Sequence, residues 1–137
     1  MSDRTDLLRR VSLFSDLERR ELESVAASLK ERTFKAGQDV AREGEGGIGF
    51  FVIREGEARV SVQGQERGRL GPGDSFGEIA LIADTPRTAT VVADTDLHCL
   101  GMTSWEFRPL VEQNAAIAWK LLKAMARKLR AVEQGSG

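Results

Sequence analysis

The apolar residues near the start of the chain recur at helical intervals. They are Leu17, Leu22, Val25, Ala26 and Leu29. Ser15 and Glu18 have the Ser-x-x-Glu spacing of a capping box, which places the start of a helix at Ser15. The pattern therefore predicts a helix from about Ser15 to Leu29, with a short turn or helix over residues 7–13 before it.

From residue 31 to 102 the pattern changes to short apolar runs separated by glycines. The runs are Phe50 to Ile53, Ala58 to Val62, Thr88 to Ala93 and Leu97 to Met102. Apolar and polar residues alternate in the second run, as in a strand with one buried face, and the Gly71-Pro72-Gly73-Asp74 turn limits that strand. Several short strands with turns between them predict a β-sandwich, roll or barrel.

Two helices are predicted after the strands. Thr103 and Glu106 form a second capping box, which begins a short helix that ends near Glu112, and Asn114 can cap a final helix. The apolar residues of that final helix share one side and are Ile117, Ala118, Leu121, Leu122, Met125, Leu129 and Val132. They either pack against the roll or form a helix pair with a second copy, and the basic residues opposite favour a solvated face. Trp105 and Trp119 are expected to be packing residues.

Composition limits the classes of partner and compartment. A chain of 137 residues with 41% hydrophobic residues has the size of a single domain over 1–137, with helical segment 1–30, roll 31–102 and helices 103–134. A net charge of -1 predicts no binding of nucleic acid by this chain alone and none to membranes. The N-terminus lacks an apolar signal core and no span is apolar enough for a membrane, which predicts a cytoplasmic protein. The single cysteine, Cys99, is expected to be a buried thiol.

Residues 76–91, FGEIALIADTPRTATV, combine the parts of an anion site. Gly77 lets the backbone approach a ligand, and Glu78 to Ala83 can form a helical turn whose first N–H groups attract a phosphate oxygen. Arg87 supplies a permanent charge with a forked donor, whereas the carboxylate of Glu78 repels phosphate and suits sugar hydroxyls. Each residue also has a simpler explanation: Glu78 favours a helix N-terminus, Arg87 pairs with Asp84 or Asp74, and the glycines shape turns.

Taken together, this segment closely resembles the phosphate-binding cassette of the cyclic-nucleotide-binding domain family. That family includes regulatory subunits of cAMP-dependent protein kinase, cyclic-nucleotide-gated channels and bacterial catabolite activators. The glycine-rich residues 43–56, the turn at 70–74 and the helix at 114–129 also resemble the family, with Phe50 or Phe51 where a tyrosine is usual. The resemblance implies an α+β, mainly β fold: a jelly-roll-like β-roll with an N-terminal helix and two C-terminal helices.

The resemblance also implies roles for individual residues. Gly77 and Ala80 would offer backbone N–H groups, Glu78 would accept the ribose 2′-hydroxyl, and Arg87 would hold a phosphate oxygen. Thr88 and Ala89 would close the cassette. Threonine after the arginine is frequent in cGMP-responsive members, but cAMP-responsive bacterial sensors also carry it, so cAMP is favoured over cGMP.

The implied mechanism is a regulatory switch without catalysis. Nucleotide binding would order the cassette and draw the final helix over the base. The candidate lid residues are Arg127, Arg130, Ala131 and Val132. The ligand would be cAMP or cGMP, with no cofactor or metal, and a homodimer through the final helix is one arrangement.

Other interpretations remain. The chain could be the sensor half of a larger catabolite-activator-like transcription regulator or ion channel, but no helix-turn-helix follows Glu133, so this chain is not expected to read DNA alone. It could be a degenerate relative that binds nothing. Metal-dependent cupin enzymes also use β-rolls, but they need several histidines and this chain has only His98.

Overall fold

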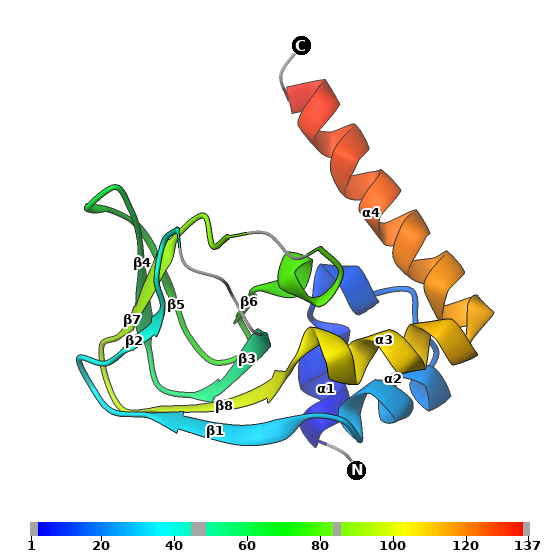
Figure 1. Cartoon of the computed structure of the whole chain (residues 1–137), viewed down its shortest axis with the longest axis horizontal. Coiled ribbons are helices and arrows are strands. Elements are labelled where there is room, and N and C mark those ends of the chain that lie inside the picture. Colours follow the sequence, from blue (N-terminus) through cyan, green and yellow to red (C-terminus); the bar gives the residue numbers. More distant parts are fainter. Residues whose placement is uncertain (1–2, 45–48, 84–85, 136–137) are drawn as a thin grey trace. The chain divides into compact units, whose positions relative to one another are not determined.

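The computed structural model describes residues 3–44, 49–83 and 86–135, and Figure 1 traces the elements. The chain divides into two compact units. One contains the N-terminal residues Met1–Ala27 and the C-terminal residues Pro109–Gly137, and the other contains Ser28–Arg108.

The first unit is helical. Its elements are α1 (Asp3–Arg9), the 3-10 helix η1 (Ser12–Phe14), α2 (Arg19–Ala26), the end of α3 (Ser104–Gln113) and α4 (Ala115–Gly135). Its buried core includes Leu8, Phe14, Leu22, Val25, Ile117 and Leu121. The short helical elements α1 and η1 confirm the turn expected over residues 7–13.

The first predicted helix begins later than its sequence suggested. Its N-cap is Glu18, whose backbone N–H donates to Glu21 Oε1 at 2.8 Å in a capping box one turn further along. Ser15 Oγ instead donates to the carbonyl of Ser12 at 2.8 Å, so its side chain closes the preceding 3-10 turn. The expected start at Ser15 and end at Leu29 were therefore wrong, and α2 spans Arg19–Ala26.

The second unit consists mainly of two antiparallel four-stranded sheets. The strands are β1 (Lys30–Phe34), β2 (Asp39–Ala41), β3 (Phe50–Glu55), β4 (Ala58–Val62), β5 (Gln65–Leu70), β6 (Ser75–Phe76), β7 (Thr90–Ala93) and β8 (Leu97–Met102). Their order is β1-β8-β3-β6 in one sheet and β2-β7-β4-β5 in the other. This arrangement confirms the mainly β class and the jelly-roll-like β-roll with terminal helices.

The two sheets enclose an apolar cluster. It contains Ala41, Ile53, Ala58, Val91, Ala93, Leu97 and Cys99, with several half-buried apolar residues packed against it. The rings of Phe34 and Phe51 meet edge to face at 5.7 Å between centroids, and Phe51 lies 5.5 Å from Phe76. Cys99 is buried as expected, and desolvation raises the pKa of its thiol to about 11.

The capping box at α3 is confirmed. The Thr103 N–H donates to Glu106 Oε1 at 2.9 Å, and the Glu106 N–H donates to Thr103 Oγ1 at 3.3 Å. Lys30 Nζ lies 2.6 Å from Glu106 Oε2. The hydrogen bond from Lys30, followed by that from the Thr103 backbone, lowers the pKa of Glu106 to about 2. This pair joins the first strand of the roll to the helix that follows the last strand.

Other predictions for the C-terminal helices need correction. Asn114 directly precedes α4, but its side-chain amide donates to the carbonyl of Leu110 at 2.8 Å, at the end of α3. Trp105 and Trp119 are each 64% exposed, so their interpretation as packing residues was wrong. The apolar stripe of α4 is buried only in its first half. The exposed members include Leu122, Leu129 and Val132.

Candidate functional site

The segment singled out in the sequence connects β6 to β7. After Phe76 the backbone turns at Gly77, forms the 3-10 helix η2 (Glu78–Leu81) and returns through residues 86–89 to β7. Asp84, one of the two carboxylates considered as a partner of Arg87, lies outside the described residues. The segment therefore joins β6, an edge strand of one sheet, to β7, an inner strand of the other.

Gly77 is required at its position by both conformation and space. Its φ is 84°, in the left-handed region that favours glycine. A Cβ built on Gly77 would clash with Arg87 Nη1 and with the carbonyl oxygen of Gly49. The glycine therefore allows a guanidinium group and two backbone segments to approach one another.

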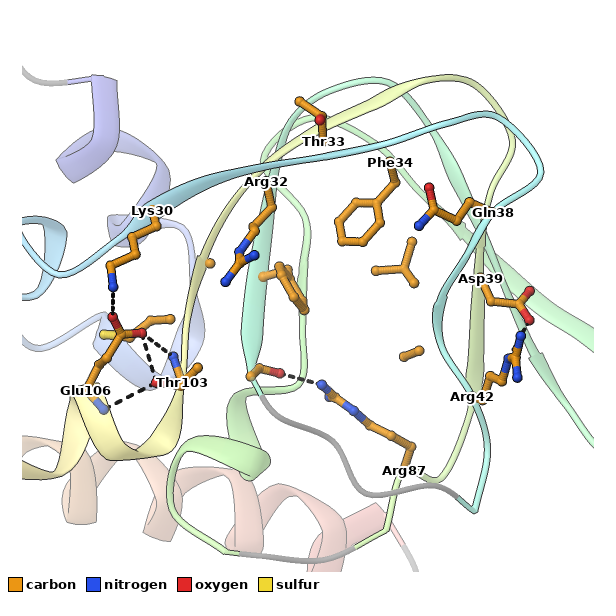
Figure 2. Close-up of a pocket in the computed structure, with 16 residues that line it drawn as sticks. Lys30, Arg32, Thr33, Phe34, Gln38, Asp39, Arg42, Arg87, Thr103 and Glu106 are labelled. Carbon is orange, nitrogen blue, oxygen red and sulfur yellow. Dashed lines mark hydrogen bonds and ion pairs between the residues drawn. The ribbon is translucent and has the colours of Figure 1, made fainter.

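Arg87 is held in place by backbone groups. Its Nη2 donates to the carbonyl oxygen of Gly49 at 2.5 Å (Figure 2), and its own carbonyl accepts from the Gly44 N–H at 2.8 Å. Among the described residues no carboxylate pairs with it, and Asp74 accepts instead from the Gly71 N–H at 2.8 Å. Desolvation lowers the pKa of Arg87, but the group stays charged at any physiological pH. A half-buried cation without a carboxylate partner attracts an anion.

The six sequence-predicted ligand residues line one cavity of about 390 Å³. They are Gly77, Glu78, Ala80, Arg87, Thr88 and Ala89. The volume lies within the range of small-molecule sites. The structure thus brings Glu78 from η2 and Arg87 from the returning segment to one cavity, together with the small residues of the cassette.

Sequence reasoning missed the apolar walls of this cavity. Ala41, Val60, Leu70 and Val91 also line it, from strands of the second sheet. The alternation along β4 gave a signal for Val60, because it predicted an inward-facing side chain there. No local pattern indicated that this face would meet the segment 77–89, since that contact depends on how the sheet folds over.

One predicted donor is already engaged. The Ala80 N–H donates to the carbonyl oxygen of Gly77 at 3.0 Å, which is the internal bond of the 3-10 turn. Ile79, on the same short helix, is 67% exposed. Ile82, directly after the helix, is 50% exposed. Glu78 and Ile79 both line the cavity, and Ile79 and Ile82 are also exposed to solvent.

The candidate lid residues belong to the helical unit. Arg127 donates to both carboxylate oxygens of Asp16, at 2.9 and 2.8 Å, and also to Ser15 Oγ at 3.4 Å. Arg130, Ala131 and Val132 are exposed along α4. Because these residues and the cavity lie in different units, the lid stays a prediction.

In the part of the chain that the structure describes, no three His, Cys, Asp or Glu side chains are grouped to hold a metal ion. Over the same residues, no helix has the length and apolar character needed to cross a membrane.

Similar solved structures share this architecture. The N-terminal domain of a transcriptional regulator from Streptomyces coelicolor is 29% identical, with a TM-score of 0.88 and coverage of 96% of each chain. The catabolite activator protein of Thermus thermophilus is 27% identical, with a TM-score of 0.72 over 90% of this chain and 61% of its own. The regulatory domain of the Toxoplasma gondii kinase PKA, crystallised with cAMP, is 31% identical, with a TM-score of 0.70 over 78% of this chain and 42% of its own.

A family comparison agrees with these structures. The model of the cyclic nucleotide-binding domain matches residues 31–114, which include β2 to β8, all of β1 except Lys30, and the candidate cavity. Members of this family are regulatory domains that bind a ligand. The chain belongs to the cyclic nucleotide-binding domain family.

Proposed function

We propose that this chain is a cytoplasmic regulatory module that binds a cyclic nucleotide at the cavity beside Arg87 and has no catalytic activity. The supporting observation is that the six cassette residues line one cavity. In this proposal Arg87 holds a phosphate oxygen, and Glu78 accepts the ribose 2′-hydroxyl. Gly77 and Ala80 face the phosphate with their backbone, and Thr88 and Ala89 close the site.

The charges of the cavity favour this division of the ligand. Arg87 Nη2 already donates to the Gly49 carbonyl, so the other N–H groups of the planar guanidinium can bind a phosphate monoanion. Glu78 lines the same cavity, and a carboxylate accepts hydroxyl protons but repels phosphate. The apolar walls formed by Val60 and Leu70 suit the ribose and purine.

The test is calorimetric titration of the whole chain with cAMP. We expect Arg87→Ala to weaken binding about 10- to 150-fold, the equivalent of losing one charge-assisted bond of roughly 1.5–3 kcal/mol. Arg67→Ala removes the same charge from an exposed position of β5 and serves as the control. Absence of micromolar binding by the wild type, or equal binding by Arg87→Ala, would reject the proposal.

Within this proposal the favoured nucleotide is cAMP. The Toxoplasma gondii regulatory domain was crystallised with cAMP, and Thr88 here is exposed at the cavity wall. A threonine hydroxyl can bond the guanine amino group, so cGMP is the alternative. Titration with both nucleotides decides. Tighter binding of cGMP, reduced by Thr88→Ala more than cAMP binding is, would overturn the preference for cAMP.

We also propose that nucleotide binding is coupled to movement of α4. Ile79 and Ile82 present an exposed apolar pair beside the cassette, and α4 carries exposed Leu122 and Leu129. Apolar groups exposed on two elements tend to be buried against each other. Hydrogen exchange of α4 should slow when cAMP is added, and Ile82→Ser should remove that effect while cAMP still binds. An unchanged exchange rate in the wild type would reject the coupling.

The same exposed apolar stripe of α4 also favours self-association. The exposed residues Leu122, Met125, Leu129 and Val132 are spaced three, four and three apart, which is the seam of a two-stranded coiled coil. We propose a homodimer through this seam. Sedimentation should show a dimer that Leu129→Glu converts to monomer, whereas Lys123→Glu, at an exposed position with a larger charge change, should leave the dimer intact. A monomeric wild type would contradict this proposal.

The Streptomyces coelicolor match favours a role as the sensor part of a transcription regulator, because that structure is described as the N-terminal domain of one. The reading frame tests this role. A coding sequence that continues past Gly137 into a helix-turn-helix region would support it, and a stop codon directly after Gly137 would contradict it.

A further inference from the structure

A second and larger cavity lies in the β-roll unit, on the other side of Arg87. Its volume is about 520 Å³, and its lining residues come from β1, β2, the start of β3, the end of β8 and the start of α3. Of the cassette residues it contains only Arg87. Neither the family comparison nor the proposed nucleotide site assigns a role to this cavity.

The strand register directs cationic side chains into the roll. Lys30, Arg32 and Phe34 alternate along β1 and therefore share one face. Arg32 is paired with Cys99 on β8, and opposite residues of antiparallel strands lie on the same face. Cys99 belongs to the buried cluster between the sheets, so Arg32 extends from the core-facing row of an edge strand.

The charges around this cavity do not balance. Its cations are Lys30, Arg32, Arg42 and Arg87, and its carboxylates are Asp39 and Glu106. Both carboxylates are engaged: Lys30 pairs with Glu106 at 2.6 Å and Arg42 pairs with Asp39 at 2.7 Å. Arg32 and Arg87 are left without a carboxylate among the described residues. The cavity therefore carries an excess of positive charge.

The side chains that remain available converge on one space. Figure 2 shows Arg32, Phe34 and Gln38 pointing into the cavity, whereas Thr33 points away and the Asp39–Arg42 pair lies at its edge. Within the described chain the guanidinium of Arg32 has no hydrogen-bond partner. The side-chain amide of Gln38 uses only its oxygen, Oε1, which accepts from the Lys35 N–H at 3.0 Å. Both side chains are exposed, so the Arg32 guanidinium and the Gln38 amide are solvated donors that a ligand in the cavity can reach.

The cavity is also lined by apolar side chains. Phe34 and Phe51 form an edge-to-face pair at 5.7 Å, and Val40, Ala41 and Met102 also line the cavity. A site with an apolar, aromatic surface and a few convergent donors is typical of small-molecule binding. We infer that this cavity binds a small organic anion in which a carboxylate is attached to an aromatic ring, with the carboxylate on Arg32 and the ring on Phe34 and Phe51. This inference goes beyond nucleotide binding and does not rest on it.

The test uses naphthoate as the probe and two-dimensional NMR of the labelled whole chain. We expect saturable shifts at Arg32, Phe34 and Gln38, with a Kd below about 1 mM. Naphthylmethanol, which keeps the ring without the charge, and acetate, which keeps the charge without the ring, should each bind at least about tenfold more weakly. Equal binding of naphthylmethanol would overturn the assignment of Arg32 to the anion.

Variants separate this site from its alternatives. Arg32→Gln should weaken naphthoate binding at least about fivefold and leave cAMP binding unchanged, and the control Arg67→Gln should change neither. If Arg32 only keeps the edge strand β1 from pairing with other chains, naphthoate will not bind and Arg32→Gln will self-associate, which overturns the inference. One-to-one displacement of naphthoate by cAMP would also overturn it. If the wild type binds naphthoate but not cAMP, the proposed nucleotide site is rejected and this inference stands.

Discussion

Arg87 Nη2 donates to the carbonyl oxygen of Gly49 at 2.5 Å, a bond between residues 38 positions apart. Gly49 directly precedes β3, whereas Arg87 lies just before β7 in the other sheet. The bond therefore holds the guanidinium against the residue that precedes a strand of the other sheet. Because that acceptor is a neutral carbonyl, the positive charge of Arg87 remains available to an anion.

Gly77→Ala should destabilise the protein by more than the strain of an alanine in a left-handed conformation. The new Cβ would meet both Arg87 Nη1 and the Gly49 carbonyl oxygen. Gly37→Ala is the matched control, because Gly37 has a φ of 87° and no atom within 4 Å of an added Cβ. We expect the control to lose about 1 kcal/mol of unfolding free energy and Gly77→Ala to lose roughly 2–4 kcal/mol. Equal losses in thermal unfolding would contradict the packing around Gly77.

The stability of the α3 capping box should depend on pH. The pKa of Glu106 is lowered from 4.5 to about 2, so its ionised form contributes stability fully above pH 4.5, and this contribution is lost as the pH falls towards 2. Glu106→Gln should lower Tm by about 3–5 °C at pH 7 and much less near pH 2. Glu55→Gln, at an exposed position of β3, is the control. A Tm difference between wild type and Glu106→Gln that does not vary with pH would show that the carboxylate charge is not responsible.

The thiol of Cys99 should be unreactive in the folded protein. It is 2% exposed, and burial raises its pKa to about 11, which leaves about one thiolate in a thousand at pH 8. A disulfide reagent such as dithiobisnitrobenzoate should label the unfolded chain within minutes and the native chain only as fast as it opens. Rapid stoichiometric labelling of the native protein would contradict the buried position of Cys99.

Asp16→Asn tests the proposed lid. Arg127 donates two hydrogen bonds to Asp16, and these bonds are the main cause of the lowered pKa of that carboxyl. If Arg127 covers the base when nucleotide binds, releasing it from Asp16 should tighten cAMP binding about threefold or more. Asp6→Asn removes an exposed carboxylate of α1 and should leave affinity unchanged. The same affinity in Asp16→Asn and wild type would argue against Arg127 as a lid residue.

The strands that sequence patterns predicted are those with apolar faces. β3, β4 and β8 coincide with the apolar runs, because each is an inner strand and its side chains fill the core. β1 (KERTF) and β5 (QERGRL) were not predicted as separate strands. Both are edge strands with mostly exposed side chains, and charged residues on an edge prevent pairing with other chains. The local composition of these two segments therefore does not identify them as strands.

The candidate site, like the strands, was predictable from the sequence only in part. The resemblance pointed to all six cassette residues, and they share one cavity. The Gly49 acceptor of Arg87 and the unpaired Arg32 in the second cavity were not predictable. Each depends on contacts between segments far apart in the chain, which no local spacing encodes.

The most direct test of the central claim compares cAMP with its 2′-deoxy analogue, using calorimetry on the wild type and Glu78→Ala. If Glu78 accepts the ribose hydroxyl, the wild type should bind the analogue about 10- to 150-fold more weakly than cAMP, and Glu78→Ala should bind both about equally. Arg87→Ala should lose affinity for both ligands and still discriminate between them. Failure of the wild type to bind cAMP, or equal discrimination by wild type and Glu78→Ala, would contradict the account.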